Sequence, residues 1–339
     1  MPTPAFEWKE YEVSADMGGE NLELLVAEAA PATVTVAIPN LSAFPSPLAK
    51  AEILLQSAAE VEHALMVQYL YAAYSLKTPG EVSDPAQKQA LVETSETAWP
   101  QVLLSIAREE MGHLMTVQNL LLLLGLAPNF EREDFPPRKD LYPFKLHLEP
   151  LTRRSLAKYV VAEAATDATG IEDIIALSTE SAGATINRVG VLYGMLGVVF
   201  TADGAVQSGA SGDAGWDAIV RRLAAAAHQQ APPEAWHLHD EDFHPQVLSR
   251  QADPEDWQVG HLRVHRAADR VAAIQAIRDI GEQGEGPTTA SELSHFARFL
   301  TTFRGGAGLP PFPEASESVT REVPTDPKVQ DITDARTRR

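Results

Sequence analysis

Apolar residues at helical spacing dominate the middle of the chain. At 48–76 and 99–124, apolar side chains recur every three or four positions, the period of a helix packed on one side. The turn signal at 77–80 ends the first run, and Gly125 caps the second. Weaker helical patterns follow at 152–200 (interrupted near 169–170 and 182–183), 261–283 and 290–303, with one short helix in 216–260. The pattern predicts an all-α fold built on a helical bundle.

The two ends of the chain differ from this helical middle. Residues 1–45 contain NLELLV and ATVTVAI, whose length and β-branched residues are typical of strands. We therefore expect a small strand-containing N-terminal extension, followed by the bundle at 46–305 with long insertions between its helices. Residues 306–339 are rich in proline and polar residues and are expected to form a disordered tail.

Composition narrows the chemistry more than the fold. The chain has 339 residues, of which 45% are hydrophobic, enough for a sizeable core. Its net charge of −20 argues against nucleic acid and anionic membranes as partners. It has no cysteines, so any metal would be held by His, Asp and Glu. The N-terminus does not resemble a signal peptide and charges interrupt the apolar runs, so we expect a soluble cytoplasmic protein.

Charged residues in the first two long helices gather near the middle of each helix. Between 53 and 76 they are Glu60, Glu62 and His63. Between 99 and 126 they are Arg108, Glu109, Glu110 and His113. A solvated face would spread its charges along the helix, so this clustering indicates a buried polar site.

Helical phase selects three of these residues as inward-facing. The neighbours of Glu62 at helical spacing are apolar or aromatic, whereas those of Glu60 are more polar. Glu110 is likewise surrounded by apolar residues, while Glu109 lies beside serine, glycine and threonine. His113 follows Glu110 by three positions, so both project from one face of the helix.

A metal ion is one way to accommodate such groups, because a buried carboxylate without a partner is costly. Ferritin-like metal proteins place Glu on one helix and Glu-x-x-His on the next, all pointing into the bundle. The alternative is purely structural. In it, Glu110 hydrogen-bonds His113 and Glu62 belongs to a polar network.

The second half of the chain should supply matching ligands. GEQGEG contains Glu282 and Glu285, and SELSHFARF contains a second Glu-x-x-His, formed by Glu292 and His295. Glu285 continues the apolar face of the preceding helix and is preferred over Glu282, and the glycines beside it would let the backbone unwind near a metal. For Glu292, an exposed helix end is the favoured interpretation.

Four motifs resemble the ferritin-like family named for iminophenyl-pyruvate dimer synthase; in order they read AAEVEHALMVQYLYAAYSLK, REEMGHLMTVQNLLLLLG, EQGEG and SHFARF. The resemblance covers most of residues 45–305 and implies a ferritin-like four-helix bundle. It also implies an iron-dependent oxidase or oxygenase of secondary metabolism, acting with O₂ or peroxide on an aromatic or amino-acid-derived small molecule. By position, the metal ligands of the family fall on Glu62, Glu110, His113, Glu285 and His295.

One motif departs from the family pattern. The family has Gly-Glu-x-Tyr on the third bundle helix, whereas residues 190–193 read Gly-Val-Leu-Tyr, with Val191 in place of the glutamate. One carboxylate is then missing, and two divalent ions would carry excess positive charge into a low-dielectric interior. We therefore expect one tightly bound iron ion rather than two, unless another carboxylate such as Glu163 or Glu180 completes the site.

Further expectations concern the substrate and the competing functions. An apolar substrate should lie near Met66, Tyr69, Met111 and Tyr193, and a homo-oligomer is compatible with the sequence. A degenerate bundle that binds a partner or small molecule without turnover is the main alternative, which the missing glutamate would favour. Iron storage fits less well, because a shell subunit would not carry such insertions and tail.

Two histidine groups outside the bundle centre are also candidates for separate metal sites. His237 and His239 lie among acidic residues, and His261 and His265 are four positions apart. A polar loop and an exposed helix face are the favoured explanations for them.

Overall fold

The computed structural model describes residues 5–14, 33–92, 95–137, 141–142, 144–164, 168–179, 189–257, 262–285 and 293–328, with the backbone alone at 284 and 285. The helices are α1 (Pro47–Ser75), α2 (Pro85–Ala90), α3 (Trp99–Leu123), α4 (Arg153–Ala162), α5 (Glu172–Ser178), α6 (Val189–Phe200), α7 (Ala214–Ala227), α8 (Arg270–Glu285) and α9 (His295–Arg304). The strands are β1 (Trp8–Ser14) and β2 (Thr33–Pro39). Short 3-10 turns lie at Pro79–Glu81, Asp203–Ala205, Pro233–Ala235, Asp240–Asp242, Pro245–Arg250, Pro254–Trp257 and Ser316–Ser318. The fold is mostly helical, as predicted.

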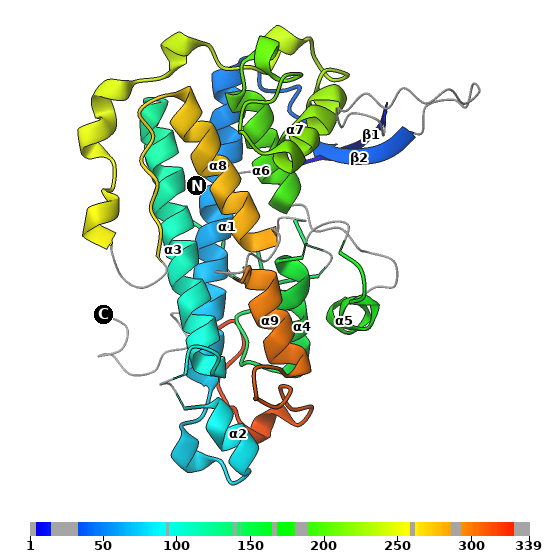
Figure 1. Ribbon diagram of the computed structural model, residues 1–339, viewed down its shortest axis with the longest axis vertical. Coiled ribbons are helices and arrows are strands. Elements are labelled where there is room, and N and C mark those ends of the chain that lie inside the picture. The colour runs from blue at the N-terminus through cyan, green and yellow to red at the C-terminus, as the bar shows by residue number, and fades with distance from the viewer. Residues whose placement is uncertain are drawn as a thin grey trace.

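Helices α1 and α3 form the unbroken side of the bundle and pack against each other along their lengths (Figure 1). α1 begins where the Ser46 side chain accepts a backbone hydrogen bond from the first turn and Pro47 takes the first helical position. Beyond α3, Gly125 has a φ of +69°, which suits glycine at a helix end. Neither these nor the other described helices are long and apolar enough to cross a membrane.

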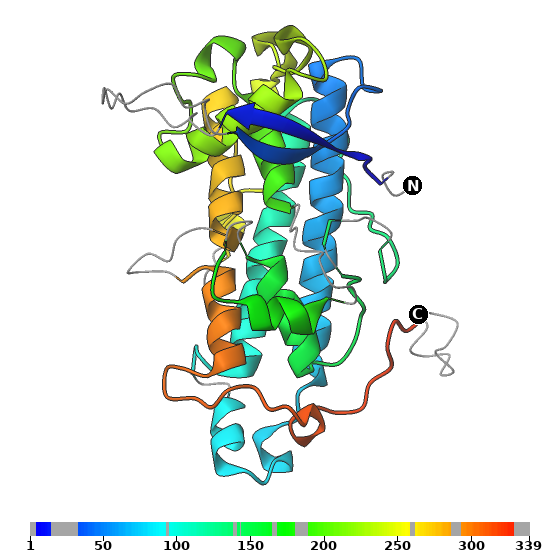
Figure 2. The ribbon, with the colours of Figure 1, turned by 90° about the vertical axis from the view of Figure 1, so that its right-hand side faces the viewer.

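The other side of the bundle consists of two columns, each built from two short helices. α6 stands above α4, and α8 stands above α9, so that both columns are interrupted at about mid-height (Figures 1 and 2). α6 packs on α8 and on α1, while α4 packs on α9. Four columns therefore surround one interior, and the two interruptions lie at the same level within it.

The fourth long helix was predicted at 261–283, but in the structure it begins later. Residues 262–269 are not helical, and α8 starts at Arg270. Two side chains of α3 bind the backbone of this segment: the Thr116 hydroxyl accepts from the His265 amide at 3.0 Å, and the Asn119 amide donates to the His265 carbonyl at 2.8 Å. Gly112 lets this segment approach α3, because a Cβ there would meet the Arg263 carbonyl oxygen at 2.3 Å. These contacts with α3 therefore hold the segment 262–269 in a non-helical conformation.

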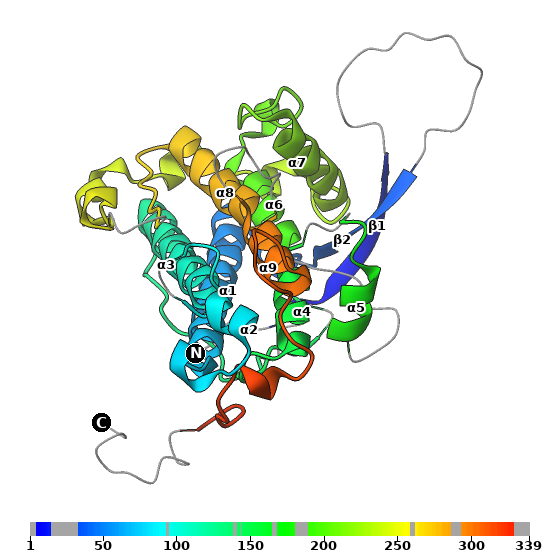
Figure 3. The ribbon, with the colours of Figure 1, turned by 60° about the horizontal axis from the view of Figure 1, so that its bottom comes forward.

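The N-terminal hairpin packs against α7 at the side of the bundle (Figure 3). β1 and β2 are antiparallel, with Trp8 opposite Pro39, and Val13 and Ile38 belong to the same hydrophobic core as the bundle. The predicted strand ATVTVAI is confirmed as β2. NLELLV lies outside the described residues, and the partner strand is instead β1, which was not predicted.

The prediction of a disordered tail is wrong for residues 306–328. Phe312 is fully buried, with its ring centroid 5.0 Å from that of Trp99. Val319 is also fully buried, and Thr320 pairs with Leu76 in an isolated β-bridge. Proline and polar residues suggested disorder, but a few apolar side chains anchor this segment across the end of the bundle.

Candidate metal centre

Five ionisable side chains meet where the two broken columns are interrupted. Glu62 comes from α1, Glu110 and His113 from α3, Glu163 from the residue after α4, and His295 from the first residue of α9. All five are at most 4% exposed. Buried ionisable groups of this kind are rare unless they are paired or bind a metal.

The first group is formed by Glu62, Glu110 and His113, as helical phase predicted. His113 Nδ1 lies 2.9 Å from Glu110 Oε2 and 3.3 Å from Glu62 Oε2. One potential ligand atom from each of the three residues lies within 4.8 Å of the others. Such spacing allows one ion to contact all three side chains.

The second group is formed by Glu110, Glu163 and His295, and it has the same arrangement. His295 Nδ1 lies 3.1 Å from Glu110 Oε1 and 3.4 Å from Glu163 Oε2, and the ligand atoms again lie within 4.8 Å of one another. Glu110 belongs to both groups, with one oxygen facing each histidine. The two groups therefore define two adjacent positions that share a carboxylate.

A tyrosine holds the outer carboxylate of each group. The Tyr193 hydroxyl donates to Glu62 Oε1, and the Tyr69 hydroxyl donates to Glu163 Oε1 at 2.5 Å. The other oxygen of each carboxylate faces a histidine. Each phenol thus fixes the orientation of its carboxylate and leaves one oxygen directed toward the centre.

In the absence of a cation, protons offset the buried charge. Burial raises the pKa of Glu62 to about 7, and neighbouring Glu110 adds to this effect. Burial alone would lower the pKa of His113, but the neighbouring carboxylates of Glu110 and Glu62 raise it to about 10. The pKa of Glu110 lies well below its usual range because two histidines outweigh the effect of burial. A metal ion would replace these protons.

The donor atoms fit a divalent transition metal. Among the described residues, Glu62 Oε2, Glu110 Oε1 and His295 Nδ1 are buried and lack a hydrogen-bond partner, although each faces the centre. Carboxylate oxygen and imidazole nitrogen suit iron, manganese or zinc. The buried Glu and His groups can therefore hold a metal, whose identity the side chains alone do not specify.

Comparison with known proteins agrees with this geometry. The sequence profile of a family described as ferritin-like matches residues 55–304. The chain belongs to the ferritin-like family. Over 130 residues it is 31% identical to dichlorochromopyrrolate synthase from Lentzea aerocolonigenes. The match covers 34% of this chain and only 13% of that enzyme. No solved structure matches the chain significantly.

This ferritin-like chain brings four of the five predicted ligands together, and the fifth lies outside the described side chains. Glu62, Glu110, His113 and His295 converge, and His295 does so although it lies beyond the interrupted column. Only the backbone of Glu285 is described, so its role stays a prediction. Glu292 also lies outside the described residues. Glu282 is 3.7 Å from Arg278 and does not belong to either group.

Glu163 supplies the carboxylate that Val191 lacks. Val191 is half-buried on α6, and two positions later Tyr193 reaches Glu62. The sequence named Glu163 only as one carboxylate that would complete a two-ion site. Glu180, the other such carboxylate, lies outside the described residues. With Glu163 at the centre, the carboxylate whose absence led to the expectation of a single ion is present.

The remaining histidines do not form a comparable group among the described residues. His237 is buried, donates from Nδ1 to the Thr201 carbonyl at 2.8 Å and approaches His228 at 3.1 Å through Nε2. His239 is exposed and does not join them. His265 Nδ1 lies 3.8 Å from Asp279, while His261 is outside the description.

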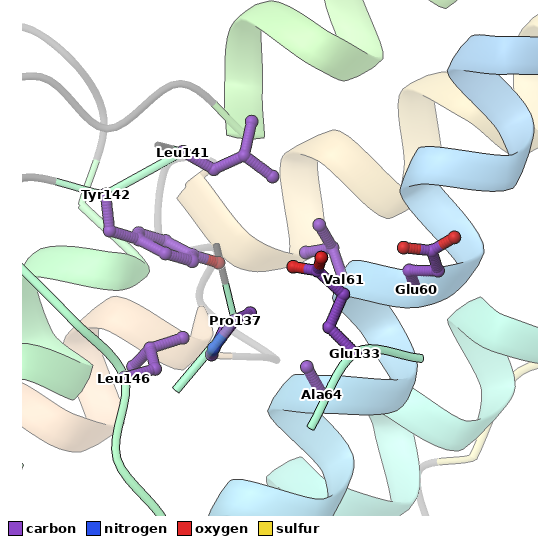
Figure 4. A pocket seen from close by; sticks show the side chains of 8 residues that line it. All are labelled: Glu60, Val61, Ala64, Glu133, Pro137, Leu141, Tyr142 and Leu146. Carbon is purple, nitrogen blue, oxygen red and sulfur yellow. The ribbon is translucent and has the colours of Figure 1, made fainter. Parts of the chain in front are cut away.

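A pocket opens beside α1, on the face that carries Glu60, Val61 and Ala64 (Figure 4). The cavity itself has a volume of about 30 Å³, within about 400 Å³ of space between the lining residues that includes open solvent. Its apolar wall consists of Val61, Ala64, Pro137, Leu141, Tyr142 and Leu146, and Glu60 and Glu133 add two carboxylates. Burial first, and then neighbouring carboxylates, raise the pKa of Tyr69 and Tyr193 at the centre.

The substrate contacts expected of four residues stay a prediction. Tyr69 and Tyr193 are buried and hold the carboxylates of the centre. Met66 and Met111 are half-buried, and neither lines the pocket beside α1. Sequence phase located the phenols next to the centre but could not identify the loop residues, such as Tyr142, that enclose the pocket.

Proposed function

We propose that this chain is an iron-dependent oxidoreductase of secondary metabolism, similar to iminophenyl-pyruvate dimer synthase and acting on an aromatic or amino-acid-derived small molecule. The observation that carries the proposal is the pair of buried Glu/His groups sharing Glu110, with centre-facing atoms that lack hydrogen-bond partners. The partial likeness to dichlorochromopyrrolate synthase supports a biosynthetic reaction. The alternative, a bundle that binds without turnover, rested on a missing carboxylate, and Glu163 weakens it.

Two ions, rather than one, fit the donor set that we propose. Glu62, Glu110 and Glu163 carry three negative charges, and the predicted ligand Glu285 would bring a fourth, which would balance two divalent ions. Glu110 would contact both positions, while each outer carboxylate and its histidine would contact one. Bound iron would supply one-electron chemistry with O₂ or peroxide.

The side chains around the centre would orient the ligands and exclude water. Tyr193 and Tyr69 fix the outer carboxylates, so few ligand motions are needed when an ion enters. Phe299 is fully buried, with its ring centroid 5.0 Å from that of Tyr69, and closes the side of α9. An apolar enclosure of this kind limits loss of reactive species to solvent.

The pocket beside α1 is the substrate site that we propose. Its apolar wall and the Tyr142 ring suit a planar aromatic molecule, while Glu60 and Glu133 favour an N–H group over an added carboxylate (Figure 4). Ala64→Phe should fill the pocket and weaken binding of indole, used as an aromatic N–H probe, by at least about tenfold while metal content stays unchanged. Equal indole affinity in both proteins would exclude this site.

Metal analysis tests the function most directly. Protein from iron-supplemented medium, or apo-protein given Fe(II) without oxygen, should contain about two iron ions per chain by mass spectrometry. The matched control is Glu52→Gln, on the same helix but bonded only to Gln56 in the described structure, which should keep its iron. Wild-type protein that takes up no iron under either condition would contradict the proposal and favour the non-catalytic bundle.

A further inference from the structure

A chain of hydrogen bonds links the outer edges of the two histidines. His113 Nε2 lies 2.9 Å from the Gln283 side-chain oxygen, and the Gln283 amide nitrogen donates to Glu109 Oε2 at 3.0 Å. His295 Nε2 lies 2.8 Å from the same Glu109 oxygen. Glu109 and His113 belong to α3, Gln283 to α8 and His295 to α9. The chain therefore runs behind both metal positions and connects three helices.

Glu109 is buried, contrary to the polar surroundings that its sequence neighbours suggested. It is 2% exposed, and Arg298 donates to both of its oxygens, one through Nη1 at 2.9 Å and the other through Nη2. A carboxyl group that accepts from a guanidinium at both of its oxygens is a carboxylate, so Glu109 can only accept hydrogen bonds.

The donor and acceptor roles along the chain follow from this charge. Because Glu109 accepts, the Gln283 amide must point its NH₂ group at Glu109 and its carbonyl at His113. The Gln283 carbonyl also only accepts, so His113 Nε2 must carry a proton. His295 Nε2 must likewise carry one, because it faces Glu109 directly. In both rings Nδ1 is then the nitrogen available to a cation.

We propose that Glu109, anchored by Arg298, is a positioning residue that fixes the ring orientation and the Nε2–H tautomer of both histidines, with Gln283 transmitting this effect to His113. The inference rests on the proposed metal site and adds a prediction of which of the two positions binds metal more tightly. His295 hydrogen-bonds a carboxylate, which raises the donor strength of the ring more than the amide carbonyl behind His113 does. The position beside His295 and Glu163 should therefore bind metal more tightly.

Cobalt(II) added to the apo-protein tests this inference without an activity assay. Co(II) shifts the N–H protons of bound histidines in NMR spectra, and such protons persist only when a hydrogen bond protects them from exchange. Wild-type protein should show two shifted, slowly exchanging N–H signals. Gln283→Leu should lose one of these N–H signals and weaken the binding of one Co(II) ion by about tenfold. Glu109→Gln should change both N–H signals and weaken the binding of both ions by about ten- to a hundredfold.

Two further variants separate a positioning role from a structural one. Gln283→Glu can still accept from His113, so it should keep the signal that Gln283→Leu loses, although it no longer donates to Glu109 and should shift the His295 signal. Glu282→Gln is the adjacent control, since Glu282 lies near Arg278 and outside the chain of hydrogen bonds, and it should match wild type. Gln283→Leu leaves the Glu109–Arg298 pair intact, so the test survives if Glu109→Gln does not fold.

The outcomes distinguish this inference from the proposed function. Wild-type protein that binds no Co(II) at the Glu/His groups would remove the metal site, and the inference with it. Metal binding that persists with both N–H signals and unchanged affinity in Gln283→Leu would overturn the inference alone. Loss of the same signal in Glu282→Gln would also overturn it, because the effect would then not depend on the hydrogen-bond chain.

Discussion

The two halves of the centre are built from different kinds of chain. Glu62 and Glu110 lie inside helices of 29 and 25 residues, whereas Glu163 follows a helix of 10 residues and His295 begins another of the same length. Inside a long helix, the direction of a side chain follows from the helical period. At a helix end it depends on the cap and on the chain beyond. The α1–α3 half is therefore specified locally, and the other half by tertiary structure.

The same contrast extends to the way each half is held in place. α1 and α3 pack along their lengths, so many apolar contacts fix Glu62 and Glu110. His295 instead depends on a helix start that Ser294 caps by accepting from the Ala297 amide. Helix ends open at lower free energy than helix interiors. We therefore expect the α1–α3 half to be preformed and the α4–α9 half to depend more on bound metal.

Removal of the shared carboxylate should have the largest effect, because it affects both halves at once. Glu110→Gln replaces one of the two shared oxygens with NH₂, removes the negative charge between the two positions, and leaves His113 and His295 without their common counter-charge. We expect iron content to fall close to zero and the apo-protein to lose about 3 kcal/mol of unfolding free energy. Metal analysis and urea unfolding measure these effects. Retention of one full iron per chain would show that Glu110 is not shared.

Changes to the outer carboxylates should be smaller and should separate the halves. Glu62→Gln and Glu163→Gln each remove one ligand, so each protein should keep about one ion per chain, bound at the other position. Glu62→Gln should leave the apo-protein about as stable as wild type, because burial has already raised the pKa of Glu62 to about 7. Metal titration measures the number of ions that each variant binds. Unchanged stoichiometry in Glu163→Gln would show that Glu163 is not a ligand of the second position.

Sequence alone predicted the α1–α3 half nearly completely. Glu62, Glu110 and His113 were identified because their helical neighbours are apolar, and the structure brings them together. Helical phase gave the wrong exposure for Glu109, because its small polar neighbours suggested that its side chain faces solvent. In the structure α9, which is distant in sequence, covers Glu109 with His295 and Arg298. A helix can be read from its own residues, but the element that packs on each face cannot.

The other half was predicted less well for the same reason. His295 was identified through its Glu-x-x-His motif and the family resemblance, while Glu163 remained a fallback because a carboxylate was expected at Val191 on α6. The structure instead draws the carboxylate from the end of α4 and uses α6 for Tyr193. The substitution depends on both columns being interrupted at one level, which no local pattern encodes (Figure 2).

Removal of the two tyrosine hydroxyls should have the smallest effect on metal binding. The two substitutions compare the halves of the centre most directly. Tyr193→Phe and Tyr69→Phe each remove one hydroxyl that donates to an outer carboxylate, without changing ligand charge. Loss of such a bond should weaken metal binding by about tenfold at the affected position. If the α4–α9 half depends more on bound metal for its order, Tyr69→Phe should have the larger effect and should also increase hydrogen exchange at the start of α9. Tyr193→Phe should leave exchange in α1 unchanged, because helix packing already fixes Glu62. Metal titration with exchange mass spectrometry measures both quantities, and equal effects in the two variants would show that the halves are equally preformed.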